Sequence, residues 1–134
     1  MTNWLKVIGT SRQKFRREWT TEAPHLLRVA TFAGRCSWQP GDEFLYHAIG
    51  VDGSRLVAIG AVLSACYHNP DIDPGFEFAC DIRLTTKRPL VSEGVPLEDV
   101  NVRGGRDLRR TVARRSHIRL TDAEFERAKR ALAT

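Results

Sequence analysis

The sequence lacks most of the features that staple small secreted proteins or anchor proteins in membranes. Its three cysteines are odd in number and widely spaced, so we expect a reducing compartment and no disulfide framework. It has no apolar run of about 20 residues, the length that a membrane-spanning helix needs. Its first residues do not combine a basic start with a hydrophobic stretch, so we expect no secretory signal. Together these absences predict a cytoplasmic protein.

The motifs of common catalytic and metal sites are also missing. There is no Gly-x-Ser-x-Gly, no Cys-x-x-Cys and no His-x-x-x-His, and the stretch 103–106 is too short for a phosphate-binding glycine loop. Cys66 and His68 are close in the chain, but Cys66 is better explained as a small buried residue at a strand end. We therefore predict no catalytic residues, no metal site and no cofactor.

The chain of 134 residues fits one α+β domain spanning residues 1–134, with 42% hydrophobic and 28% charged residues. Residues 41–84 are the most informative stretch. They read as a β-meander, with strands at 42–49, 55–65 and 77–84 and a tight Asp52-Gly53 turn. Two of these strands carry too little charge to face water on both sides. Gly60 inside the second strand indicates a bend or bulge. We therefore predict a small, twisted, partly open β-barrel of about five to six strands flanked by helices.

The remaining elements are predicted from hydrophobic periodicity. Residues 3–8, 25–32 and 116–120 read as strands, and residues 12–20 and 107–115 read as helices. Residues 67–75 form a surface excursion, and residues 95–99 suggest a short helical turn. Thr121 and Glu124 form a capping box that starts a final helix running to about Leu132. Trp4 and Trp19 are assigned to the core.

Basic residues outnumber acidic residues by 21 to 16, and the excess is uneven. Seven arginines and one acid lie between positions 103 and 119. Arginine suits bidentate phosphate contacts better than lysine does. Were 106–115 one helix, Arg106, Arg110 and Arg114 would form a stripe along it. The alternative is a solvated helix flank. The predicted phosphate-binding residues are Arg103, Arg106, Arg109, Arg110, Arg114 and Arg115.

Several aromatic residues stand near loops, where flat faces at a barrel mouth could stack on a base. Trp38 precedes the turn at 40–42, and Tyr67 follows the second strand of the meander. Tyr46 lies within a strand, and packing inside the barrel is the preferred explanation for it. Trp38 could instead plug the barrel end, but we favour a role in binding.

The ordered motifs from about residue 34 onward resemble an EVE domain of the PUA-like superfamily. They are Pro40-Gly41-Asp42 before a strand with a tyrosine, Ile59-Gly60 in the next strand, Tyr67-x-Asn-Pro70, the strand 78–84 with its aspartate, Pro89-Leu90, Pro96-Leu97 and the closing segment 118–125. The resemblance implies a partly open barrel that binds nucleic acid, with a pocket for a modified, flipped base. It places pocket residues after the first strand and before the third. The residues predicted to line the pocket are thus Thr10, Ser11, Arg35, Trp38, Tyr46 and Tyr67.

The leading prediction is a non-catalytic reader of DNA or RNA, with nucleic acid as partner and no membrane. One alternative is an ASCH-like hydrolase of modified nucleosides, since PUA-like folds include such domains. Lys6, Thr10 and Lys14 with Glu77 or Asp81 could supply its chemistry. Another alternative is a protein-interaction subunit that uses the arginine-rich segment to dock an acidic partner.

Overall fold

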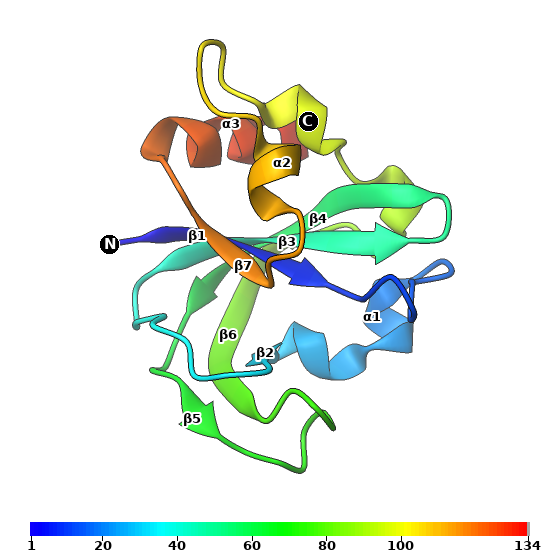
Figure 1. Cartoon of the computed structure of the whole chain (residues 1–134), viewed down its shortest axis with the longest axis vertical. Helices are drawn as coiled ribbons and strands as arrows, with labels where there is room; N and C mark the ends of the chain where they lie inside the picture. Colours follow the sequence, from blue (N-terminus) through cyan, green and yellow to red (C-terminus); the bar gives the residue numbers. More distant parts are fainter. Residues whose placement is uncertain (134) are drawn as a thin grey trace.

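Seven strands form one mixed sheet in the computed structural model, which describes residues 1–133. In chain order the strands are β1 (Asn3–Ile8), β2 (Val29–Phe32), β3 (Glu43–Gly50), β4 (Gly53–Val62), β5 (Tyr67–His68), β6 (Phe78–Lys87) and β7 (His117–Leu120). Across the sheet they run β2–β6–β4–β3–β1–β7, with β5 paired to β6. Only β1 and β3 pair in parallel within the described residues. The sheet curls into a half-barrel (Figure 1), which confirms the predicted α+β, twisted, partly open barrel. The extra strand is β5, whose two residues are too few to show a periodic pattern.

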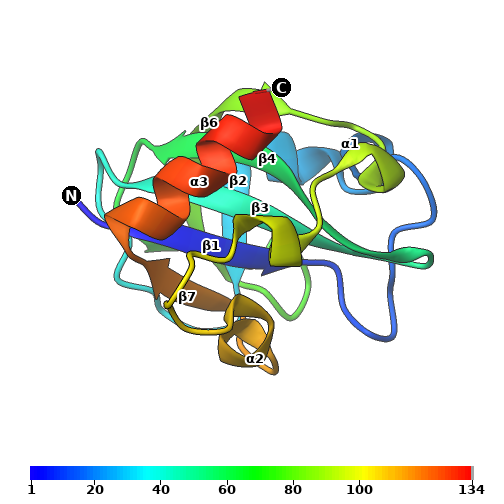
Figure 2. The same cartoon turned by 90° about the horizontal axis from the view of Figure 1, so that it is seen from above.

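Side-chain alternation divides the interior into two cores, one on each face of the sheet. On β1, Trp4 joins one core and Leu5 the other, and Phe44 and Leu45 divide in the same way on β3. The first core lies inside the curl, beside α1 (Trp19–Glu22) and the 3-10 turn η1 (Pro24–Leu27). The second core is covered by α2 (Leu108–Val112), α3 (Asp122–Ala133) and the 3-10 turn η3 (Leu97–Val100). Figure 2 shows α3 lying across the sheet. The meander strands therefore avoid water both by curling and by being covered.

The β3–β4 hairpin forms where predicted, with a different turn. Gly50 pairs with Gly53, so the central residues are Val51 and Asp52. Neither has a positive φ, while Gly53 has a φ of 121°. The glycine therefore follows the turn, and the predicted primed turn centred on Asp52-Gly53 is corrected. The bulge predicted at Gly60 is confirmed by a shift of register between Ile59 and Gly60 against β6.

The N-terminal third departs from the predicted pattern. Residues 12–18 do not form a helix, and α1 supplies only four residues from Trp19 onward. Two isolated bridges instead connect this segment to the rest of the fold, one from Phe15 to Gly50 and one from Glu18 to Leu90. The predicted strand 25–32 begins at Val29, because Pro24 starts the 3-10 turn η1 ahead of it. Tertiary contacts of Phe15 outweigh the helical spacing of Phe15 and Trp19.

The arginine-rich segment forms a shorter helix than predicted. Residues Leu108–Val112 are helical, and the side chain of Asp107 caps the helix by accepting from the Arg109 N–H at 3.0 Å. Arg114 has a φ of 61°, the only positive φ of a non-glycine residue among those described. Arg106 thus precedes the helix and Arg114 follows it, so the predicted stripe of Arg106, Arg110 and Arg114 does not exist on one helix.

The C-terminal helix forms as predicted. The Thr121 N–H donates to Glu124 at 2.8 Å, and the Glu124 N–H donates to the Thr121 hydroxyl at 3.1 Å. These reciprocal bonds satisfy two amides at the start of α3, which confirms the capping box. A third 3-10 turn, η2 (Val91–Glu93), lies between β6 and η3. Among residues 1–133, every helix is too short or too polar to cross a lipid bilayer.

Candidate functional site

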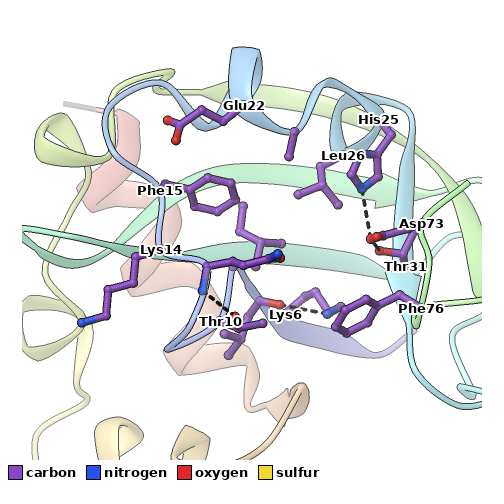
Figure 3. Close-up of a pocket in the computed structure, with 15 residues that line it drawn as sticks. Lys6, Thr10, Lys14, Phe15, Glu22, His25, Leu26, Thr31, Asp73 and Phe76 are labelled. Atoms are coloured by element: carbon purple, nitrogen blue, oxygen red, sulfur yellow. Dashed lines mark hydrogen bonds and ion pairs between the residues drawn. The ribbon is translucent and has the colours of Figure 1, made fainter.

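A cavity of about 340 Å³ opens beside the C-terminal end of β1. Its walls come from β1 and the loop after it, from α1 and η1, from β2 and from the loop between β5 and β6 (Figure 3). Such a volume lies in the range of about 300–1,000 Å³ that is typical of small-molecule sites. The lining residues are Lys6, Val7, Ile8, Gly9, Thr10, Gln13, Lys14, Phe15, Glu22, Ala23, His25, Leu26, Thr31, Asp73 and Phe76.

The end of β1 shapes one wall of this cavity. Gly9 has a φ of 79°, and a Cβ there would meet the Phe15 ring at 3.0 Å. Glycine at this position therefore lets the chain turn and lets Phe15 pack closely. The Phe15 backbone donates to the Ile49 carbonyl at 2.9 Å and accepts from the Val51 N–H at 2.9 Å. The aromatic wall is thus fixed to the β3–β4 hairpin rather than carried on a free loop.

Lys6 brings a buried positive charge to the cavity. Its residue is 4% exposed, and its ammonium lies 5.0 Å from the centroid of the Phe32 ring. The ammonium donates to the Val7 carbonyl at 2.8 Å, which leaves two of its three N–H bonds for a ligand. Burial lowers the pKa of Lys6 from 10.5 to about 8, with partial compensation from the charge of Asp73. The lysine is therefore mostly charged at neutral pH.

Asp73 supplies a hydrogen-bond acceptor to the cavity. Its Oδ2 accepts from the Thr31 hydroxyl at 3.0 Å and lies 3.2 Å from His25 Nε2 (Figure 3). The Oδ1 atom receives no hydrogen bond from the described residues. The loop backbone is closed by the Phe76 N–H, which donates to the Asp73 carbonyl at 2.9 Å. Asp73 is therefore held in place with one oxygen available to a donor.

Polar groups and cations surround the mouth. The Gln13 N–H donates to the Thr10 hydroxyl at 2.9 Å, which closes the turn after β1. Glu22 accepts from the backbone N–H groups of Arg16 and Arg17 at 2.8 and 3.0 Å. Lys14 points away from the cavity towards solvent (Figure 3).

A second hollow of about 370 Å³ lies on the far side of Phe15, which lines both hollows. Its walls include Arg16, Arg17 and Arg55, together with residues of the β3–β4 turn. Two hollows thus share an aromatic wall, and one of them is lined by arginine.

The structure places the predicted pocket residues in different surroundings. Thr10 lines the cavity, whereas Ser11 is exposed in the adjoining loop and does not line it. Arg35 is exposed, with its guanidinium 5.7 Å from the Phe78 ring centroid. The Tyr67 hydroxyl donates to the Asp81 carboxylate at 2.5 Å, outside the cavity. Only Thr10 of these four therefore lies at the site.

The placement of Trp38 at an open barrel mouth is corrected. Its side chain is fully buried, with the Phe32 and Phe44 ring centroids at 4.9 and 5.1 Å. The indole N–H is buried and finds no hydrogen-bond partner among the described residues. Tyr46 is also fully buried, and its hydroxyl donates to the Leu26 carbonyl at 2.9 Å. Both rings fill the interior of the curl and do not line the cavity.

The predicted phosphate-binding arginines divide into two groups. Arg106 forms a two-pronged ion pair with Glu124, and Arg109 contacts Glu98 at 2.6 Å. All six residues are exposed, but four have no acidic partner among the described residues: Arg103, Arg110, Arg114 and Arg115. The Val7 N–H donates to the Ser116 carbonyl at 2.8 Å, so the end of this segment is tied to the strand that lines the cavity.

Sequence reasoning missed most of the cavity. Lys6 had a detectable signal, because it interrupts the apolar strand Trp-Leu-Lys-Val-Ile and a buried lysine has to be paired or functional. Asp73 lies in the stretch 67–75 that the pattern marked as a surface excursion, and Phe76 directly follows that stretch. His25 and Thr31 come from segments far from that loop in the chain, and only the fold brings them together.

Comparisons with known proteins agree on the fold. No protein-family model and no curated protein matches the sequence. Among solved structures, a hypothetical protein from Leishmania major is similar with a TM-score of 0.64 at 11% identity, over 97% of this chain and 93% of that one. A protein from Rhodopseudomonas palustris gives a TM-score of 0.56 at 19% identity, over 99% and 94%. The human THYN1 protein, solved in complex with 5-methylcytosine-containing DNA, gives 0.60 at 13% identity, over 94% of each chain.

Identities this low show a common fold and nothing finer. The alignments span nearly the whole of each chain. The chain therefore has the PUA-like fold, and its resemblance to EVE domains is confirmed at the level of the fold.

Proposed function

We propose that this protein binds nucleic acid and reads a modified base that is turned out of its strand into the cavity beside β1. The observation that carries the proposal is that one cavity with apolar walls holds both a buried ammonium, Lys6, and a carboxylate fixed by hydrogen bonds, Asp73. Small-molecule sites typically combine mostly apolar walls with a few convergent polar groups. Reading the edge of a base uses this kind of arrangement.

The polar groups favour a base with both a carbonyl and an exocyclic amine. Lys6 can donate to a ring carbonyl, and the Oδ1 atom of Asp73 can accept from an amine, as acidic side chains do from cytosine N4. Phe15 and Phe76 offer aromatic faces, and Leu26 offers an apolar surface against which a methyl group could pack. A methylated cytosine meets all of these requirements.

Exposed cations around the mouth suit the strand that carries such a base. Arg12 and Lys14 lie in the loop after β1, and Arg114 and Arg115 precede the Ser116 carbonyl that is bonded to β1. Turning a base out of its stack costs a few kcal/mol, which phosphate contacts and stacking must offset. Arg106 and Arg109, which are paired with acids, are less suited to this task. Binding of 5-methylcytosine-containing DNA by a protein of the same fold, human THYN1, supports the proposal.

The test compares binding of matched oligonucleotides that carry 5-methylcytosine or cytosine at one position. Fluorescence anisotropy of labelled single- and double-stranded forms gives the dissociation constants. We expect tighter binding of the methylated form than of the plain form, and weaker binding of the methylated form by Asp73→Asn. One base-edge contact is worth about 1–3 kcal/mol, so the affinity for the methylated strand should fall roughly 5- to 150-fold. Asp71→Asn is the matched control, because Asp71 is exposed in the same loop and does not line the cavity.

Two results would contradict the proposal. One is equal binding of methylated and plain oligonucleotides, across cytosine and adenine modifications, by the unmodified protein. The other is an equal effect of Asp73→Asn and Asp71→Asn. Either result would mean that the cavity does not recognise a modified base.

Lys6 also favours a second candidate, hydrolysis of a modified nucleoside. A lysine with a pKa of about 8 can act as a general base near neutral pH. Thr10 lines the same cavity, as the hydrolase alternative expects, whereas the Lys14 side chain points away from it and Glu77 and Asp81 do not line it. Incubation with acylated and alkylated nucleosides followed by mass analysis distinguishes the candidates. Turnover that is lost in Lys6→Met would favour the enzyme over the reader.

A further inference from the structure

The fold gathers the three cysteines, which lie far apart in the chain. Cys36 comes from the loop between β2 and β3, Cys66 from the connection between β4 and β5, and Cys80 from β6. Their sulfur atoms all lie within 4.8 Å of one another. Cys36 Sγ and Cys80 Sγ are 3.6 Å apart, and the Cys36 N–H donates to Cys66 Sγ at 3.4 Å. None of the three lines the cavity described above, so this cluster is a separate feature.

The separation of the Cys36 and Cys80 sulfurs matches that of thiolates that share one tetrahedral cation, and the Cys66 sulfur lies within 4.8 Å of both. With zinc–sulfur bonds of about 2.3 Å, tetrahedral angles place neighbouring sulfurs roughly 3.8 Å apart. The measured 3.6 Å between Cys36 and Cys80 is close to that value. A disulfide, by contrast, would use only two of the three sulfurs and draw them to about 2.05 Å. Three sulfurs converging on one point are better explained by a shared ligand than by a cross-link.

Positive charge lies beside the three cysteines. Two cations lie near the cluster, because Lys6 interacts with Cys36 and Arg35 interacts with Cys66. Three thiolates and one divalent cation would carry a charge of about −1, which Lys6 can balance.

Access is available from one side. Cys36 and Cys66 are partly exposed, while Cys80 is fully buried in the core inside the curl. Solvent can therefore reach the sulfurs and complete the coordination shell. We propose that Cys36, Cys66 and Cys80 bind one zinc ion through their sulfur atoms, with water in the fourth position. The ion would tie the β2–β3 loop to β6 and to the end of β4.

The test uses untagged, fully reduced protein under anaerobic conditions. Co²⁺ serves as the spectroscopic probe, since thiolate coordination gives a strong charge-transfer absorption in the near ultraviolet. We expect saturation at one Co²⁺ per chain, displacement by one Zn²⁺, and a rise in the thermal midpoint when zinc is added, because zinc binds the folded chain. Cys36→Ser and Cys66→Ser should each weaken the binding of Co²⁺ at least about tenfold and reduce the absorption.

Two variants serve as matched controls. Ser37→Ala changes an exposed neighbour of Cys36, and His68→Ala removes an exposed histidine close to Cys66 in the chain. Both should bind Co²⁺ as the unmodified protein does. Thermal midpoints measured without metal show whether each cysteine variant is folded. The buried Cys80 is not substituted, because the two partly exposed cysteines are sufficient for the test.

Three results would overturn the proposal. The first is that the reduced protein binds neither Co²⁺ nor Zn²⁺ stoichiometrically. The second is that both serine variants bind Co²⁺ as the unmodified protein does. The third is that bound Co²⁺ lacks the thiolate charge-transfer absorption in the near ultraviolet. Formation of a Cys36–Cys80 disulfide in air by protein that binds neither metal would also overturn it. These outcomes do not depend on nucleic acid, so the site is tested independently of the proposed function.

Discussion

Lys6 is the residue at which sequence and environment conflict most. A lysine is rarely buried without a partner, because an apolar environment disfavours its charged form. Here the ammonium has the Val7 carbonyl, the face of the Phe32 ring and the charge of Asp73 nearby. Burial nevertheless lowers its pKa from 10.5 to about 8. Retaining a charge at such a cost is typical of a functional site.

We expect the folded protein to be stabilised as Lys6 loses its proton. Below pH 8 the lysine is charged in both folded and unfolded chains, and the folded state bears the full penalty. Between pH 8 and 10.5 the unfolded chain binds more protons, so the free energy of unfolding rises with pH from this group. We therefore compare the free energy of unfolding of Lys6→Met with that of the unmodified protein. The variant's advantage should be about 2–3 kcal/mol larger at pH 7.5 than at pH 10.5.

Urea unfolding of both proteins at several pH values measures this difference. Comparing the two curves removes the titration of the other side chains. Lys87→Met is the control, because Lys87 is exposed on β6. A difference between Lys6→Met and the unmodified protein that stays constant from pH 7.5 to 10.5 would contradict the buried charge.

The burial of a single residue could be predicted where the residue belongs to a local apolar pattern. Trp4 and Trp19 are 4% and 0% exposed, as their apolar settings predict. Trp38 stands outside any periodic pattern, so its burial could not be predicted, and four aromatic or histidine rings surround it in the fold. Contacts between distant segments decide such positions, and one sequence does not contain them.

At the scale of elements, the start of α3 combines a local motif with a long-range ion pair. Glu124 accepts from the Thr121 N–H and also from two nitrogens of Arg106, each at 3.0 Å. Burial would raise the pKa of Glu124, but the Arg106 and Thr121 hydrogen bonds outweigh it and lower the pKa. Arg106 thereby attaches the segment before α2 to the first turn of α3.

Glu124→Gln should isolate the ion pair, because glutamine still fits a capping box. We expect a loss of about 1–3 kcal/mol in the free energy of unfolding at pH 7, as a charged hydrogen bond at a buried residue is removed. The folded-state pKa of Glu124 lies below its ordinary value of 4.5, so its contribution is present above that pH and is lost as the pH falls further. The difference between variant and unmodified protein should therefore shrink at pH 3.

Chemical denaturation at pH 7 and pH 3 provides the measurement. Glu126→Gln is the control on the same helix, since Glu126 is exposed and its pairing with Lys129 at 3.8 Å is a surface contact. It should change stability by less than about 0.5 kcal/mol. Equal losses in the two variants would show that Arg106 adds nothing at Glu124.

Helices and strands with a strong hydrophobic periodicity were predicted well, and those with a weak hydrophobic periodicity were not. The meander strands, the bulge at Gly60 and the capping box follow from local pattern. The predicted helix 107–115 shrinks to Leu108–Val112 because its two apolar residues are both buried by a single turn. Residues 113–116 are exposed, so no further buried side chain stabilises the helix beyond Val112, and the chain turns at Arg114 before β7.

At the scale of the whole molecule, charge is arranged unevenly around the half-barrel. The net charge of +5 includes exposed cations after β1 and before β7, near the strand that lines the cavity. Other cations lie on α3, which covers the opposite core. Nucleic-acid binding through phosphates releases counterions, so its dependence on salt counts the contacts that are made. The basic segment could be located from the sequence, but only the fold separates the arginines that are paired with acids from those that are not.

Three double variants should distinguish these faces. Arg12→Gln with Lys14→Gln, and Arg114→Gln with Arg115→Gln, should each flatten the slope of log affinity against log salt by about 2, or about 1 per contact. The loss should be the same for methylated and plain oligonucleotides, because phosphate contacts carry no sequence information. Arg127→Gln with Arg130→Gln on α3 removes the same charge from the other face and should leave the slope unchanged. Anisotropy titrations between about 50 and 200 mM salt provide the slopes. Equal flattening by all three pairs would mean that net charge alone drives binding, and the cavity face would then have no special part in holding the strand.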